Sequence, residues 1–323
     1  MRFSRFAVIA LLAVTIVSGT SCSYYNRIIA RKNLVDGSNA YKGRNFNEAE
    51  RLFREAVALD PNGETTEGKT AQLFLARTLH SQFIGNRSDT SKAEEAIVEY
   101  QKALSLDEAD QSSYKAIASL YENLQKSDLW LEWVTKRSTN ANIPPEQRAE
   151  ALTSLAAKKY SCANDITDTE ATKKQIAKDG KPAYQHVKPA DPAELERLRQ
   201  CIAEGTQLID QAIALESDSV KNAANFDVKG ASDGDLKEHQ DLFKVFESAR
   251  SYKTNLLFQS SFLAEMEGRN DDSERFKKQA DSAKAEFLGL SDVGKKIQAE
   301  IDARIAAEKD EGNANANSQP EGN

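Results

Sequence analysis

Apolar side chains recur at helical spacing along most of this chain, and no long stretch alternates apolar and polar residues as a strand would. The clearest segment covers residues 33–61 and reads NLVDGSNAYKGRNFNEAERLFREAVALDP. Its pattern predicts two short amphipathic helices joined by a tight turn at residues 43–45. Small residues stand where the two helices would meet, so the segment predicts a closely packed helical hairpin.

The positions of those small residues resemble the tetratricopeptide repeat, a helix–turn–helix unit of about 34 residues. Gly37 stands at the small position of the first helix, and Ala49 and Ala56 stand at the two small positions of the second. Phe53 lies between them, and Pro61 stands at the terminal proline of the motif. Small side chains let the helices approach closely, and the phenylalanine fills the groove that remains.

Later segments carry the same marks more weakly. The segments at 70–80 and 91–106 predict a second hairpin with Ala76, Ala96, Tyr100 and Ala103 at the repeat positions. Three further pairs of helices are predicted at 112–124 with 129–137, at 145–161 with a helix from Asp191, and at 236–267 with a helix to about 287. The interval 163–190 is polar and contains Gly and Pro, so it is predicted to be a surface loop.

The resemblance implies an all-α fold, an α-solenoid of about five tetratricopeptide-like hairpins over residues 31–288. A helix at 289–307 with a narrow isoleucine stripe is expected to cap the open end. The tail at 308–323 is polar and without a periodic pattern, so we expect disorder there. Scarce Gly (15) and Pro (7) in a chain of 323 residues agree with an all-α protein.

The first 21 residues have the layout of a secretory signal peptide. Arg2 and Arg5 precede the apolar run 6–17, and small residues lead to Cys22. This end resembles a bacterial lipobox, which implies a lipid on Cys22, a tether over residues 22–30, and an outer-membrane location facing the periplasm. Gly19 stands where the lipobox favours Leu, and ordinary cleavage would instead release a soluble periplasmic or secreted protein.

Cys162 and Cys201 remain as a pair if Cys22 carries lipid. Each lies on one predicted helix of the fourth hairpin, on either side of its long loop. An exported protein meets an oxidising compartment, so a disulfide between them is expected. The alternative is two separate buried thiols.

The net charge and the residue types present argue against nucleic-acid binding and against catalysis. The net charge is −7 and no run of Lys and Arg forms a basic stripe, so no nucleic-acid partner is expected. The three histidines share no metal-ligand spacing, and no catalytic or phosphate-binding motif is present. We therefore expect neither an enzyme, nor a bound metal, nor a cofactor.

The predicted function is a non-enzymatic scaffold in the bacterial cell envelope. Solenoids of this family line an inner groove with the first helix of each hairpin, and such grooves bind peptides or protein segments. Some members hold a carboxylate there with Lys and Asn, but the matching positions here are Leu34 and Ser38. The alternative is an exported binding protein for a small molecule or glycan, using Trp130, Trp133 and the interval 163–190. Packing between hairpins is the other role that fits the two tryptophans.

Overall fold

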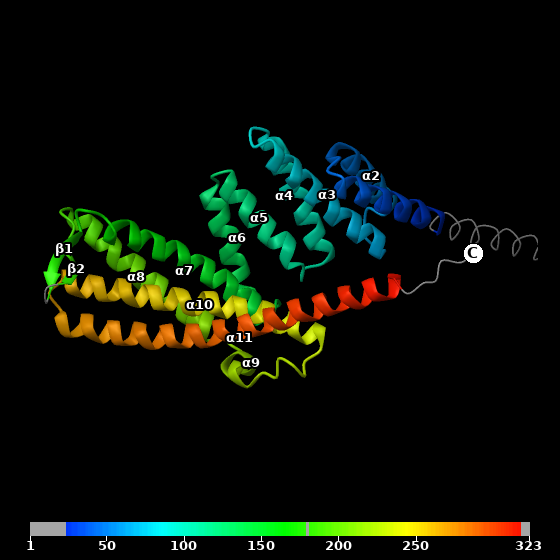
Figure 1. The fold of residues 1–323 in the computed structure, drawn as a ribbon. Helices are drawn as coiled ribbons and strands as arrows, with labels where there is room; N and C mark the ends of the chain where they lie inside the picture. The colour runs from blue at the N-terminus through cyan, green and yellow to red at the C-terminus, as the bar shows by residue number, and fades with distance from the viewer. Residues whose placement is uncertain (1–23, 179–180, 318–323) are drawn as a thin grey trace, which may run out of the picture. The chain divides into compact units, whose positions relative to one another are not determined.

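The computed structural model describes residues 24–178 and 181–317, and it divides the chain into two compact units, Met1–Trp130 and Leu131–Asn323. Helices account for nearly all regular structure in both units, so the predicted all-α fold of helical hairpins is confirmed (Figure 1). Within the described residues, no helix is both long and apolar enough to cross a bilayer.

Unit 1 is a succession of helices in which each packs against the next. Their bounds are residues 24–42, α2 (Phe46–Leu59), α3 (Thr66–Gly85), α4 (Thr90–Leu106) and α5 (Gln111–Asn123). α6 (Ser127–Thr139) crosses the boundary between the units. The order of contacts is α2 with α3, α3 with α4, and α4 with α5.

Side-chain caps explain where two of these helices begin. The Thr65 hydroxyl accepts a hydrogen bond from the Gly68 amide at the start of α3. The Asp110 carboxylate accepts bonds from the amides of Ser112 and Ser113 at the start of α5. Each cap satisfies amides that have no partner inside the helix. The turns between helices are therefore specified locally by the sequence.

Bonds between alternate helices show that the hairpins of unit 1 form a row. The Tyr41 hydroxyl lies 3.1 Å from the Ser81 hydroxyl, which links the first helix to α3. α3 is linked in turn to α5, because Arg77 Nη2 donates to Ser112 Oγ over 3.0 Å. On the other side of the row, Glu50 of α2 pairs with Lys92 of α4 at 3.0 Å. First helices thus neighbour first helices, and second helices neighbour second helices, as in a solenoid.

Unit 2 is built around one long central helix. Its elements are α7 (Pro145–Thr167), β1 (Lys173–Lys178), β2 (Lys181–His186), α8 (Pro192–Ile213), α9 (Asp218–Lys221), η1 (Ala223–Asn225), α10 (Asp233–Met266) and α11 (Asn270–Asn317). α7 packs on α8, and α10 packs against α7, α8 and α11, so the four long helices run side by side (Figure 1). Phe243, Phe246 and Leu256 of α10 are almost fully buried in the core between them.

The prediction of a surface loop at 163–190 is wrong for most of that interval. α7 continues to Thr167, and strands β1 and β2 pair antiparallel from Lys173↔His186 to Lys178↔Lys181. The sequence between the strands is Asp179–Gly180, a dipeptide typical of two-residue β-hairpins, and that signal was available. The two strands could not be recognised from the sequence, because their residues do not alternate clearly between apolar and polar positions.

The C-terminal boundaries also differ from the prediction. One continuous helix, α11, replaces both the second helix of the last hairpin and the separate capping helix at 289–307, and it extends to Asn317 in the expected disordered tail. Gly289 and Gly294 lie within this helix, and neither has a positive φ. Residues 24–30 of the expected tether are likewise helical and continuous with the first helix of unit 1.

Candidate functional sites

The seam of the first hairpin contains the predicted repeat residues. Ala49, Phe53 and Ala56 are fully buried on α2, whereas Pro61 is exposed just beyond it. Gly37 faces the Phe53 ring so closely that a Cβ atom at Gly37 would lie 2.8 Å from Phe53 Cε1. Glycine at this position therefore serves close helix–helix approach, since no larger residue fits against the unmoved ring.

The second hairpin places its four marks in the same way. Ala76 of α3 and Ala96 of α4 are fully buried, and Tyr100 and Ala103 are nearly so. The Tyr100 hydroxyl lies 3.4 Å from His80 Nδ1. Burial raises the pKa of Tyr100 and lowers the pKa of His80, so both groups are neutral near pH 7. These residues form the interior of the row and do not offer reactive groups to solvent.

The first helices of unit 1 also have an exposed surface, which we call the first-helix face and define by Leu34, Ser38, Leu73 and Arg77. Ala76 takes the place in α3 that Gly37 has in the first helix, so Leu73 and Arg77 correspond to Leu34 and Ser38. All four side chains are partly exposed. The Arg77 guanidinium lies 5.4 Å from the centre of the Phe74 ring. The face thus combines apolar side chains with a fixed cation, a composition suited to a protein segment.

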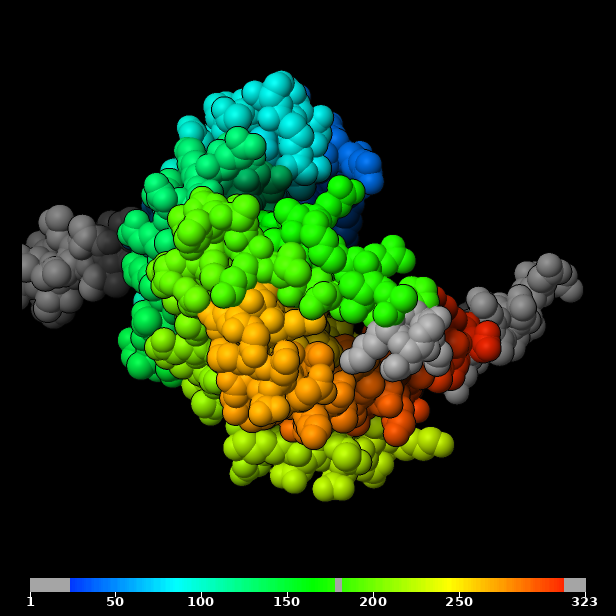
Figure 2. Space-filling model, turned by 90° about the vertical axis from the view of Figure 1, so that its left-hand side faces the viewer, coloured from blue at the N-terminus to red at the C-terminus, as the bar shows by residue number. Residues whose placement is uncertain are grey.

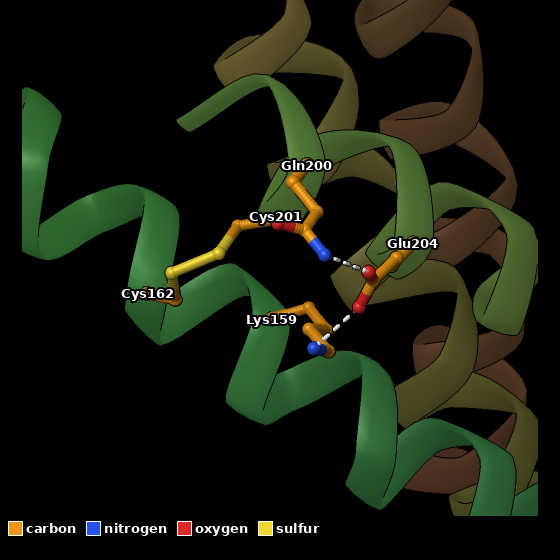
Figure 3. The surroundings of a disulfide bond; sticks show 5 residues. All are labelled: Lys159, Cys162, Gln200, Cys201 and Glu204. Carbon is orange, nitrogen blue, oxygen red and sulfur yellow. Dashed lines mark hydrogen bonds and ion pairs between the residues drawn. A yellow bond between two sulfur atoms is a disulfide. The ribbon is translucent and has the colours of Figure 1, made fainter. Parts of the chain in front are cut away.

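Cys162 of α7 and Cys201 of α8 are joined by a disulfide, with their Cα atoms 6.1 Å apart (Figure 3). The next turn of the same two helices adds an ion pair between Lys159 and Glu204, and Gln200 donates to the Glu204 carboxylate over 2.7 Å (Figure 3). The bonds to Lys159 and Gln200 lower the pKa of Glu204. Covalent and ionic links therefore hold α7 and α8 together at the base of the β-hairpin.

A cavity of about 630 Å³ lies beside this hairpin in unit 2. Figure 2 looks onto this end of the unit, where the green hairpin residues lie beside the orange residues near the α10–α11 turn. Side chains from α7, both strands, α10 and α11 line the cavity, and the polar and aromatic ones are Asn164, Thr167, Asp168, Lys173, Tyr184, Gln185, His186, Phe262, Glu265 and Lys277.

One wall of the cavity is an aromatic stack that docks the hairpin on α10. The His186 ring lies parallel to the Phe262 ring with their centres 3.8 Å apart, and His186 Nδ1 is 3.3 Å from the Glu265 carboxylate. His186 is only 7 % exposed. Burial lowers its pKa, although the Glu265 carboxylate opposes this effect, so the ring is mainly neutral near pH 7.

An exposed tyrosine beside a charged pair forms another part of the cavity lining. Tyr184 is 60 % exposed, and the Lys173 ammonium lies 4.7 Å from the centre of its ring. The same ammonium bonds to the Asp168 carboxylate at 2.7 Å, which raises the pKa of Lys173 and lowers that of Asp168. Because these charges pair with each other, the cavity offers an exposed ring and polar groups and little net charge.

The remaining residues that the sequence suggested as sites are Trp130 and Trp133 for a ligand and Cys22 for a lipid. Trp130 is 8 % exposed, which favours a packing role over an open platform for ligands. Cys22 and the predicted signal peptide lie outside the described residues. Among residues 24–178 and 181–317, no group of three or more His, Cys, Asp or Glu side chains is placed to hold a metal ion.

No protein-family model and no curated protein matches this chain. Solved structures with some likeness include one from a functional characterization of PilF of Pseudomonas aeruginosa, at 12 % identity and TM-score 0.33, over 85 % of this chain and 99 % of that one. A tetratricopeptide repeat protein from Parabacteroides merdae is also 12 % identical, with TM-score 0.32, over 84 % of this chain and 99 % of that one. Both TM-scores are below 0.5, so neither likeness identifies a function for this chain.

Proposed function

We propose that this chain is an exported, lipid-anchored scaffold of the bacterial cell envelope that binds protein segments on the first-helix face of unit 1. The observation that carries the proposal is the row of hairpins, in which Tyr41 meets Ser81 and Arg77 meets Ser112 across successive first helices. A row of this kind presents equivalent side chains at regular intervals, which suits an extended partner.

The chemistry of the face supports a protein partner over a small ligand. Leu34 and Leu73 supply partly exposed apolar surface at matching positions, and Arg77 supplies a cation held by contact with Phe74 and Ser112. Apolar contacts in the centre and a prepositioned arginine are typical of protein interfaces. Neither leucine lines the cavity beside the β-hairpin of unit 2.

The partner can be tested by affinity purification of the tagged full-length chain from native membranes. Leu73→Asp would place a carboxylate in the centre of the face, and Val98→Asp is the matched control, since Val98 is exposed on α4. We expect a specific envelope protein to be lost with Leu73→Asp and retained with Val98→Asp. Equal recovery with both variants would count against the proposed face.

The anchor is tested separately, by labelling with palmitate and by sensitivity of processing to globomycin. Cys22→Ala should abolish labelling, because the thiol that would form the thioether is removed. Several acyl chains would be needed for stable anchoring, since one chain alone binds a membrane only marginally. Wild-type chain that is processed without acquiring label would show ordinary export and a soluble protein.

A second candidate function is binding of an uncharged polar small molecule or glycan in the cavity beside the β-hairpin. It is favoured by the exposed Tyr184 ring, the polar lining and the mutual pairing of Lys173 with Asp168. A ligand that binds only the folded state raises the melting temperature by mass action. Thermal-shift screening of the wild-type chain beside Tyr184→Ala would test it, and hits that are equal in both proteins would place the ligand elsewhere.

A further inference from the structure

The first helix of unit 1 has a second apolar face that no part of the described chain covers. Tyr24, Tyr25, Ile28 and Val35 are 70, 65, 49 and 52 % exposed. With 3.6 residues per turn, these positions fall on one side of the helix together with Arg31 and Lys32. We call these six residues the outward face. Ala30, Asn33 and Gly37 are buried on the opposite side, where the helix packs within the unit.

The composition of the outward face matches the interface of a phospholipid bilayer. Tyrosines are enriched at membrane interfaces, where the ring meets acyl chains and the hydroxyl meets headgroups. Residues 24–42 contain four basic residues and one acidic residue, although the whole chain has a net charge of −7. Arg31 and Lys32 lie beside the exposed apolar side chains, as in helices that bind anionic lipid surfaces. Lys32 also pairs with Asp36 at 2.9 Å.

The length of chain that precedes the helix limits where this face can be. Tyr24 is two residues after Cys22, and two residues span at most about 7 Å. If Cys22 carries acyl chains in the bilayer, Tyr24 lies within about 7 Å of Cys22, and Ile28, one helical turn further on, lies within about 13 Å of it. An upright helix would carry Val35 about 16 Å above Tyr24, whereas a helix parallel to the surface brings the whole face to the lipid.

We propose that the first helix lies along the membrane surface with the outward face in the phospholipid headgroup region. This rests on the proposed lipid anchor for the proximity of the bilayer, and it adds a second contact beside the acyl chains. Two signals together hold a protein at a membrane much more firmly than one. Leu34 of the first-helix face projects about 120° around the helix from the centre of the outward face, so this orientation leaves Leu34 available to a partner.

Hydroxyl-radical footprinting of the purified full-length chain tests this arrangement. The chain is mixed with vesicles of phosphatidylethanolamine and phosphatidylglycerol, and tyrosine oxidation is measured by mass spectrometry with and without vesicles. Tyr184 is the internal control, because it is similarly exposed in unit 2. We expect oxidation of Tyr24 and Tyr25 to fall several-fold on vesicles while oxidation of Tyr184 is unchanged. Equal oxidation of Tyr24 and Tyr25 in both conditions would overturn the proposal.

Variants separate the outward face from the anchor. Ile28→Glu with Val35→Glu places two carboxylates on the face, and Ile84→Glu with Val98→Glu is the control at two equally exposed apolar positions of unit 1. Protection of the tyrosines should be lost with the first pair and retained with the second. The intact mass of the chain reports acylation independently. Unmodified Cys22 would refute the anchor, whereas protection that survives Ile28→Glu with Val35→Glu would refute the outward face.

Discussion

The tightest contact in the first hairpin gives a quantitative prediction for Gly37→Ala. The added Cβ would lie 2.8, 3.0 and 3.1 Å from Phe53 Cε1, Cδ1 and Cζ. The Phe53 ring is fully buried and packs against Phe74 with ring centres 5.5 Å apart, so it has little room to move. Forcing extra volume into a packed core costs about 1–3 kcal/mol.

A gain in helix propensity partly offsets this cost, since Ala is favoured over Gly by about 1 kcal/mol within a helix. The net expectation for Gly37→Ala is a loss of about 0–2 kcal/mol in the free energy of unfolding. Gly85→Ala is the matched control, because a Cβ at Gly85 would meet nothing within 4 Å. Gly85→Ala gains the same helix propensity without the packing cost, so it should stabilise unit 1 by about 1 kcal/mol, and the two variants should differ by about 1–3 kcal/mol.

Urea unfolding followed by far-UV circular dichroism measures the difference, and Phe53→Leu provides a second check. A smaller side chain at position 53 makes room for the alanine, so Phe53→Leu should cost less in the Gly37→Ala background than in the wild type. Such coupling is expected for residues in contact. If Gly37→Ala and Gly85→Ala are equally stable, or if the two substitutions add, the close seam deduced from Gly37 and Phe53 does not exist.

Three further predictions concern other contacts. Replacing Cys162 and Cys201 by Ser opens a loop with a sequence separation of 39, and on the chain-entropy model it should lower the stability of unit 2 by about 4 kcal/mol. Denaturant unfolding with and without reductant measures this loss. If reductant leaves the stability of the wild type unchanged, the disulfide is not formed. Asp110→Ala removes the cap of α5 and should cost about 1 kcal/mol, seen as faster amide exchange at the start of that helix; unchanged exchange would show that the cap is not formed. Burial lowers the pKa of His80 and His186 below 6.5, so as the pH falls the unfolded chain binds protons that the folded chain does not. The melting temperature should therefore fall as the pH drops from about 7.5 to 5.5, and less steeply when both histidines are replaced by Gln. A melting temperature of the wild type that does not change with pH would refute the burial of the two rings.

The sequence was informative where local packing rules determine the structure. The small residues at Gly37, Ala49 and Ala56 predicted the first hairpin, because close helix approach leaves few other choices at a seam. The disulfide could also be predicted, because the expected export favours an oxidised pair and Cys162 and Cys201 lie on the two predicted helices of one hairpin. Such features depend on neighbours in the sequence or on one other helix.

Other features depend on tertiary contacts that the sequence does not display. The β-hairpin is held by the stacking of His186 on Phe262, residues separated by all of α8 and most of α10, so its strands need not alternate in polarity. The same distant contact creates the cavity beside Tyr184, which could not be located before the hairpin was known. The continuity of α11 past Gly289 arises in the same way, because packing of the long helix against α10 overrides a weak local preference.

Site-specific photo-crosslinking in living cells tests most directly whether the row of hairpins exposes its first helices to a protein partner. A benzoylphenylalanine residue is placed at Leu34 or Leu73 on the first-helix face, or at Val98 on α4 as the control. We predict that the first two positions crosslink to the same envelope protein and that Val98 does not. If Val98 gives that product as readily as Leu34 and Leu73, or if neither leucine gives one, the first helices are not the binding surface.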